Sequence, residues 1–287
     1  MSELVLEIAA FFIALFCLMD CLKNRRYLYL PLPKTWSEKL RDQHFIYLSL
    51  LMTLMASAIS SALEVFLERY LHIGSTLTLN VLNETYFLFH TILSFLFTLY
   101  VLNMTGVGKE KSKTFFRVFL APFFVGELLV IVNPLTKFLF YVDESATYHR
   151  GPGMWILYGI AMIYVLLGII FFVAYKKRLS RMDRSATLIL ISIAVLGICI
   201  QGIWSITVEL FFESIGFLGF MLLLEDRRVK DRAGKKSLIN QSFIFIISLI
   251  FITVITINIV TAILFVMTLV KDRLGICGAL RALDELF

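Results

Sequence analysis

The feature that most constrains this chain is a series of apolar blocks, each about as long as a helix that crosses a lipid bilayer. Charged residues make up only 17% of the chain, well below the roughly one quarter typical of soluble domains. We therefore predict an all-α polytopic membrane helix bundle with seven transmembrane helices. The expected spans are Leu4–Leu22, Phe45–Leu67, Tyr86–Met104, Phe115–Val132, Met154–Tyr175, Ala186–Ile203 and Ser205–Leu224. An eighth apolar run extends from Phe243 to Val270.

The start of the chain does not resemble a cleaved signal peptide, because no basic segment precedes the first apolar block and no clear cleavage site follows it. We expect that block to be a retained helix. The cysteines Cys17, Cys21, Cys199 and Cys277 have neither the spacing of metal ligands nor that of a disulfide framework. We predict no metal and no cofactor.

Basic residues concentrate in alternate loops. They lie in "KNRRYLYLPLPKTWSEKLRDQ", "GVGKEKSKTFFR", "KKRLSRMDR" and "EDRRVKDRAGKK", whereas the intervening loops carry little positive charge. Cytoplasmic loops of membrane proteins are rich in Lys and Arg. This pattern predicts a multi-pass protein of the bacterial plasma membrane with its N-terminus outside. The net charge of +6 is explained by these loops, so we expect no nucleic-acid partner.

In this orientation the polar residues within the spans gather in the outer halves of the helices. Glu209 and Glu213 are four residues apart and share one helix face. Ionisable groups at membrane depth are costly unless they face the bundle interior, water or a partner. We predict an outward-open pocket for a cationic or hydroxyl-rich small ligand, or for a proton. Its candidate residues are Glu127, Glu209, Glu213, His90, Gln201, Tyr158 and Trp155.

A simpler interpretation stays open for each of these groups. The carboxylates would then lie at the headgroup boundary, solvated or paired with Arg150, Lys137 or Arg69. His90 would be a hydrogen-bonded packing residue. Trp155 and Trp204 would belong to the aromatic belt at the membrane surface.

The segment "VNPLTKFLFYVDESATYHRGPGMWILY" joins the fourth and fifth spans on the predicted outer side. Its pattern resembles the seven-helix sensory region, of the histidine-kinase N-terminal type, that precedes diguanylate cyclases and phosphodiesterases of Firmicutes. The resemblance covers roughly Tyr86 to Arg232 and includes "FVAYKKRLSRMDR" and "VELFFESIGFLGFMLLLED". The residues of the outer loop that carry it are Asn133, Pro134, Asp143, Tyr148, Arg150, Gly151 and Pro152.

The resemblance implies a receptor whose seventh helix drives a cytoplasmic output domain. It divides the chain into a sensor domain (residues 1–226), a basic cytoplasmic linker (227–242) and an apolar segment with a short tail (243–287). "SLINQSFIF" and "FITVITINI" weakly resemble the start of a cyclase domain, but Asn258 and Val260 stand where metal-binding aspartates are expected. We expect the last part to be either an eighth membrane segment, which its length and apolarity favour, or a truncated, degenerate output domain.

The function predicted from these features is detection of an extracytoplasmic or membrane stimulus and its relay to cyclic-di-GMP or kinase signalling. The partners would be the lipid bilayer, an unknown stimulus, an output domain or protein, and in one arrangement a second copy of the chain. The sequence contains no GG(D/E)EF, EAL or other catalytic signature, so we predict that it is not an enzyme. The alternatives are a small transporter or channel, or a non-functional truncated paralogue of a membrane diguanylate cyclase.

Overall fold

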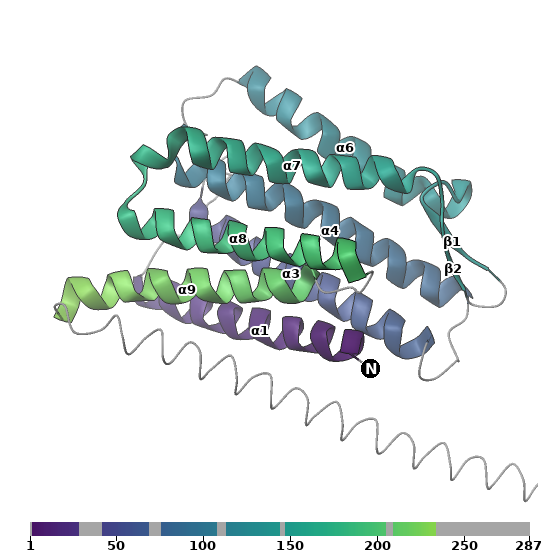
Figure 1. Ribbon diagram of the computed structural model, residues 1–287, viewed down its shortest axis with the longest axis horizontal. Helices are drawn as coiled ribbons and strands as arrows, with labels where there is room; N and C mark the ends of the chain where they lie inside the picture. The colour runs from purple at the N-terminus through teal and green to yellow at the C-terminus, as the bar shows by residue number, and fades with distance from the viewer. Residues whose placement is uncertain are drawn as a thin grey trace, which may run out of the picture.

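A computed structural model of the chain describes residues 2–28, 42–68, 76–107, 113–143, 147–204 and 209–233. The predicted eighth apolar run and the tail lie outside these residues, as does the second half of the predicted linker. The described part is a helix bundle, which confirms the all-α prediction (Figure 1). Its α-helices are α1 (Ser2–Leu28), α3 (Gln43–Phe66), α4 (Thr76–Met104), α6 (Lys113–Thr136), α7 (Met154–Tyr175), α8 (Arg181–Trp204) and α9 (Glu209–Ala233).

Five stretches in these helices are long and apolar enough to cross a membrane, so the chain is a membrane protein. They are Glu3–Leu22, Phe45–Phe66, Thr76–Met104, Thr114–Thr136 and Met154–Arg178, the last of which includes the short 3-10 helix η2 (Lys176–Arg178). They coincide with the first five predicted spans, although α4 begins ten residues before Tyr86. The helices α8 and α9 occupy the positions of the sixth and seventh predicted spans.

The helix α4 is the centre of the bundle. It packs against α3 on one side and against α7 and α6 on the other, while α1 packs against α3 and α9, and α8 packs against α9 (Figure 1). Fully buried side chains such as Leu50, Leu54 and Leu102 fill the space between these helices. By contrast, α6 exposes a row of large apolar side chains, Val118, Phe124, Val125, Leu128, Ile131 and Leu135, which suits contact with lipid.

A tyrosine hydroxyl from α7 bridges two backbone groups of α6 next to a proline. Pro122 lies inside α6, where a proline lacks an N–H group and disturbs the helical hydrogen bonds. The buried Tyr164 hydroxyl donates to the carbonyl of Phe119 at 2.5 Å and accepts from the N–H of Phe123 at 3.0 Å. These two backbone groups would be partners in a regular helix. The tyrosine hydroxyl therefore bridges them and fixes α6 to α7.

Two glycines allow α8 and α9 to approach closely. A Cβ atom on Gly197 of α8 would lie 2.7 Å from Cβ of Phe212, and a Cβ atom on Gly216 of α9 would lie 2.8 Å from Cδ1 of Leu190. Small residues at such positions favour packing between helices inside membranes. The reciprocal contacts make α8 and α9 a tightly packed pair.

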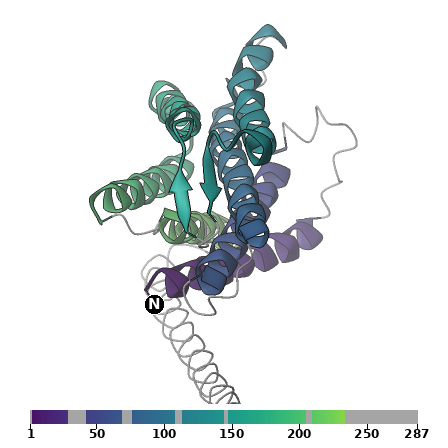
Figure 2. The ribbon, with the colours of Figure 1, turned by 90° about the vertical axis from the view of Figure 1, so that its right-hand side faces the viewer.

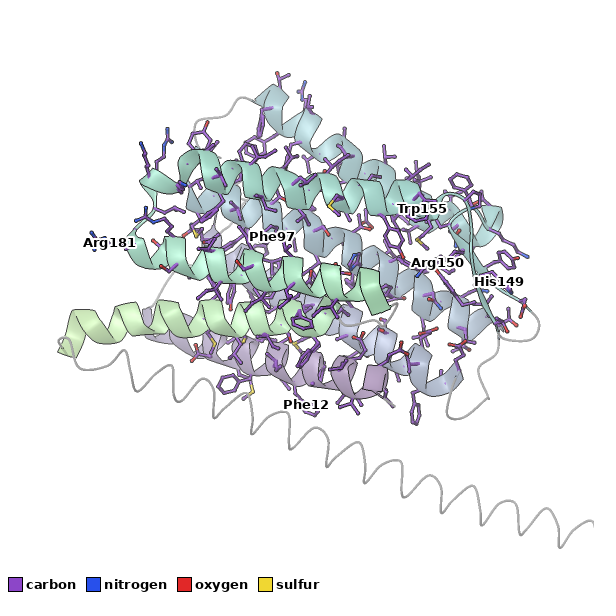
Figure 3. All side chains as sticks on the ribbon, viewed as in Figure 1. Phe12, Phe97, His149, Arg150, Trp155 and Arg181 are labelled. Atoms are coloured by element: carbon purple, nitrogen blue, oxygen red, sulfur yellow. The ribbon has the colours of Figure 1, made fainter. Side chains whose placement is uncertain are left out.

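The segment between α6 and α7, expected to be a loop, contains a small β-hairpin. Strand β1 (Phe140–Val142) pairs in antiparallel fashion with β2 (Tyr148–Arg150), with Tyr141 opposite His149. The strands lie across one end of the bundle, and the N-terminal end of α1 lies at this same end (Figure 2). Arg181 lies at the opposite end, as Figure 3 shows.

Candidate functional site

Three carboxyl groups meet inside the bundle near the end that carries the hairpin. Glu209 and Glu213 lie on the first turns of α9, and their spacing places them on one face of that helix. Glu7 comes from α1, which packs along α9, and is only 2% exposed. Electrostatic interactions join Glu7 to Glu209, and Glu213 to both of them. We call Glu7, Glu209 and Glu213 the acid cluster.

The helix α4 contributes an aromatic and basic wall to the acid cluster. His90 Nε2 lies 3.9 Å from Glu209 Oε1, and its ring stacks on that of Tyr86 with centroids 5.7 Å apart. Tyr86 also interacts electrostatically with all three acids of the cluster. From α3, the side chain of Ser61 forms a hydrogen bond with Glu7. Four helices therefore meet at this point.

Several polar atoms of this region are buried without a partner in the part of the chain that the structure describes. They are Glu7 Oε2, Glu213 Oε2 and His90 Nδ1. Buried polar groups are nearly always hydrogen-bonded, and an unsatisfied one is costly. The arrangement thus offers acceptor atoms to a proton, a water molecule or a cation. The described residues contain no group of three or more His, Cys, Asp or Glu arranged to hold a metal ion.

The hairpin is tied to the acid cluster through tyrosines. Arg150 on β2 forms a side-chain hydrogen bond with Tyr148 and interacts electrostatically with Tyr158 of α7, which in turn interacts with Glu209. Burial raises the pKa of the Tyr148 hydroxyl well above its usual range, and the nearby Arg150 guanidinium opposes this effect only in part. The phenol therefore stays neutral well into the alkaline range.

Asn133 organises the start of the hairpin. Its side-chain oxygen accepts from the N–H groups of Leu139 at 2.8 Å and Phe140 at 3.3 Å, and its amide donates to the carbonyl of Phe140 at 3.1 Å. Pro134 follows it in the last turn of α6. A methyl group on Gly151 would clash with the carbonyl of Phe138, which explains the glycine before the exposed Pro152.

The remaining polar residues of the hairpin close its turn. Asp143 Oδ1 accepts from the N–H of Thr147 at 2.9 Å, and Asp143 Oδ2 lies 2.8 Å from His149 Nε2. Asn80 of α4 accepts from the N–H of Val142 at 3.1 Å and so attaches the hairpin to the bundle. The outer-loop pattern in the sequence thus corresponds to residues that build and anchor this hairpin.

The structure brings together only part of the predicted pocket. His90 approaches Glu209, which interacts electrostatically with Glu213, and Tyr158 interacts electrostatically with both Arg150 and Glu209. Glu127 lies on α6 and shows no charge interaction with the acid cluster among the described residues, although its Oε1 atom is buried without a partner there. Trp155 is 77% exposed, so its ring forms no pocket wall and suits the aromatic belt instead. The side chain of Gln201 lies outside the described part.

The residues predicted from the sequence for the pocket did not include Glu7 or Ser61, whereas Tyr86 was expected as an aromatic wall of the pocket and does lie beside His90. The sequence does contain a signal for Glu7, because it is the acidic residue in the N-terminal half of the first apolar block. A scan against protein-family models, a search of the curated proteins and a search of the solved structures gave no match.

Proposed function

We propose that this protein is a membrane sensor whose input site is the acid cluster and whose output element is α9. One observation carries the proposal. The helix α9 bears Glu209 and Glu213 on its first turns and continues without a break to Ala233, through the charged segment "EDRRVKDRA". At 1.5 Å per residue, its 25 residues span about 37 Å, enough to connect one membrane surface to the other.

The distribution of charge supports an orientation with the hairpin outside and the charged end of α9 in the cytoplasm. The basic helix η2 (Lys176–Arg178) immediately precedes the start of α8, and Arg181, the first residue of α8, lies at the end of the bundle opposite the hairpin (Figure 3). Positively charged loops favour the cytoplasmic side. In this orientation α8 and α9 cross the membrane as the sixth and seventh helices, and the chain belongs to a bacterial plasma membrane.

The physical basis of signalling is a change in the interactions between α1, α4 and α9. The three acids interact electrostatically, so they repel one another when more than one is charged. A cation or proton that binds the cluster removes this repulsion, and it favours the helix packing in which it binds best. Because α8 is packed tightly against α9 through Gly197 and Gly216, the two helices move together. The cytoplasmic end of α9 would pass this movement to cyclic-di-GMP or kinase machinery, as the sequence resemblance implies.

Transport is less well supported than sensing. A transporter needs polar groups that continue across the membrane, and below the acid cluster α4 offers the hydroxyls of Thr91, Ser94 and Thr98. Each of these already donates to a backbone carbonyl, Thr91 to Phe87 at 2.9 Å and Ser94 to His90 at 3.3 Å. Thr98 donates across helices to Tyr164. Because these hydroxyl hydrogens are already donated to backbone carbonyls, they do not form a polar path across the membrane. We therefore favour the sensor over the transporter.

The first test concerns orientation. Single cysteines are introduced at the exposed positions Thr147, in the hairpin, and Ser180, after η2, in a chain whose own cysteines are replaced by alanine. A membrane-impermeant maleimide applied to intact cells should label the cysteine at position 147 and spare the one at position 180. The reverse pattern would contradict the proposed direction of signalling.

The second test concerns the coupling of the acid cluster to α9. Nitroxide labels at Lys177 and Arg227 report the distance between η2 and the charged end of α9 in lipid nanodiscs. Replacing Glu209 and Glu213 together by glutamine should shift this distance by about 1–2 Å, the usual size of helix movements in switches. The matched control is Glu127→Gln, which removes a half-buried acid away from the cluster. Equal distances in all three proteins would refute the sensor mechanism.

A further inference from the structure

A crevice opens between α7 and α8 and reaches inward to α4 and α9. Although consecutive in the chain, α7 and α8 make little direct contact, whereas α7 packs on α4 and α8 packs on α9. The crevice is shallow and open: its inner cavity has a volume of about 30 Å³, and the space reaches about 480 Å³ only when the open side is included. Phe97 lies between α7 and α8 in Figure 3. The apolar lining includes Leu93, Phe97, Val165, Ile169, Ala194 and Val195.

The mouth of the crevice faces the lipid. Val195 both lines the crevice and is 38% exposed, and the neighbouring Leu166, Ile170 and Leu196 are exposed as well. In a membrane these side chains contact acyl chains, because lipid-exposed surfaces of helices are apolar. A molecule dissolved in the bilayer therefore reaches the crevice without passing through water.

One carboxyl group forms part of this apolar wall. Glu213 lines the crevice, and its Oε2 atom is buried without a hydrogen-bond partner in the part of the chain that the structure describes. The other polar side chain of the lining is Ser94, whose hydroxyl donates to the carbonyl of His90. Glu213 also interacts electrostatically with Glu209 and Glu7, which do not line the crevice. The inner end of the crevice is therefore acidic.

We propose that this crevice binds a lipophilic ammonium compound that enters from the bilayer. Its ammonium group donates hydrogen bonds to Glu213, and its apolar part lies between α7 and α8. Charge complementarity selects this occupant, since a plain acyl chain would leave Glu213 Oε2 unsatisfied. The proposal names the ligand class of the input site, and it rests on the proposed function for the statement that binding moves α9.

Binding is tested on the full chain in phosphatidylcholine nanodiscs, without any signalling readout. The probes are a medium-chain alkyl diazirine that carries a primary ammonium group and the same compound with its amine acetylated. After photolysis, mass spectrometry maps the labelled peptides. We expect the ammonium probe to label α7 and α8 around Val165 and Val195 at least about tenfold more than the acetylated probe. This is the ratio for one hydrogen bond to a charged group.

Three variants decide between the outcomes. Glu213→Gln should bring the ratio close to one, and Ala194→Phe, which fills the crevice, should remove labelling by both probes. Glu127→Gln is the matched control and should label like the unmodified chain. A ratio near one in the unmodified chain, or labelling lost in Ala194→Phe but unaffected by Glu213→Gln, would show an apolar occupant and overturn the proposal.

The results of the binding test and of the sensor test can be told apart. Selective labelling that depends on Glu213, combined with an unchanged distance between labels at Lys177 and Arg227, would refute the sensor and leave the binding site intact. A distance change on substitution of Glu209 and Glu213 without selective labelling would retain the sensor and refute this ligand.

Discussion

Replacing Asn133 by alanine should detach the hairpin from the end of α6. Asn133 is 2% exposed and makes three hydrogen bonds to the backbone of β1 and the residue before it, at 2.8, 3.1 and 3.3 Å. Alanine leaves the N–H of Leu139 without its acceptor and removes a donor from the carbonyl of Phe140. Both backbone groups belong to a buried part of the hairpin.

The size of the effect follows from these contacts. Leaving a buried backbone group unsatisfied costs about 1–3 kcal/mol. The weakest of the three bonds, at 3.3 Å, shares its acceptor with the strongest, so we count two groups. With partial access of water at the membrane surface, the loss is about 2–3 kcal/mol for local opening of the hairpin. This corresponds to exchange of the hairpin amides that is faster by about 30- to 150-fold.

Hydrogen–deuterium exchange measures this opening directly. The reporting amides are those of Leu139 and of Gly151, which donates to the carbonyl of Leu139 at 2.7 Å. Asn133→Asp retains the accepting oxygen and should produce a smaller increase. Asn80→Ala, which removes one bond to Val142, provides a second comparison. Unchanged exchange at Leu139 and Gly151 in Asn133→Ala would refute the reasoning.

Four further substitutions test stability. Tyr164→Phe should lower the free energy of unfolding by about 1–3 kcal/mol, measured by denaturant titration in micelles, because the Pro122 interruption loses its bridge. Gly197→Ala should destabilise by about 1–3 kcal/mol through overpacking against Phe212. Gly159→Ala, where a Cβ atom would meet nothing within 4 Å, should instead be neutral or stabilising in the same assay. His149→Ala should change stability by less than about 1 kcal/mol, since its bond to Asp143 is half-exposed; a larger loss would show that the pair has a structural role.

The helices and the shared face of Glu209 and Glu213 could be predicted because they depend on local features of the sequence. Long apolar blocks identify membrane helices whatever their neighbours are. The four-residue spacing of Glu209 and Glu213 places them on one face of any helix. Neither rule says which helices are adjacent. Glu7 lies beside α9, and Glu127 lies away from the acid cluster, because of how the helices pack. Residue spacing along one sequence does not reveal this packing.

The hairpin escaped prediction for a different reason. Its strands are three residues long, too short for an alternating pattern to be distinguished from a loop. Asn133 belongs to the loop pattern that carries the sequence resemblance. Its role as a hydrogen-bond partner of the hairpin backbone, however, depends on how the chain turns after Pro134. The bridge formed by Tyr164 is likewise visible only once α7 is packed against α6.

The acid cluster joins the beginning of the chain to its last described helix, and this affects how the protein is made. During synthesis α1 enters the membrane long before α9. Glu7 is therefore already in the bilayer while the other helices are still being inserted. Ser61 of α3 supplies one hydrogen bond, but an acid that is not yet enclosed by the bundle is unfavourable in the membrane. Only arrival of α9 encloses it among α1, α3, α4 and α9. A chain that stalls before α9 would leave Glu7 and His90 uncovered, and this exposed polar surface would distinguish unfinished copies from complete ones for the proteases that survey the membrane.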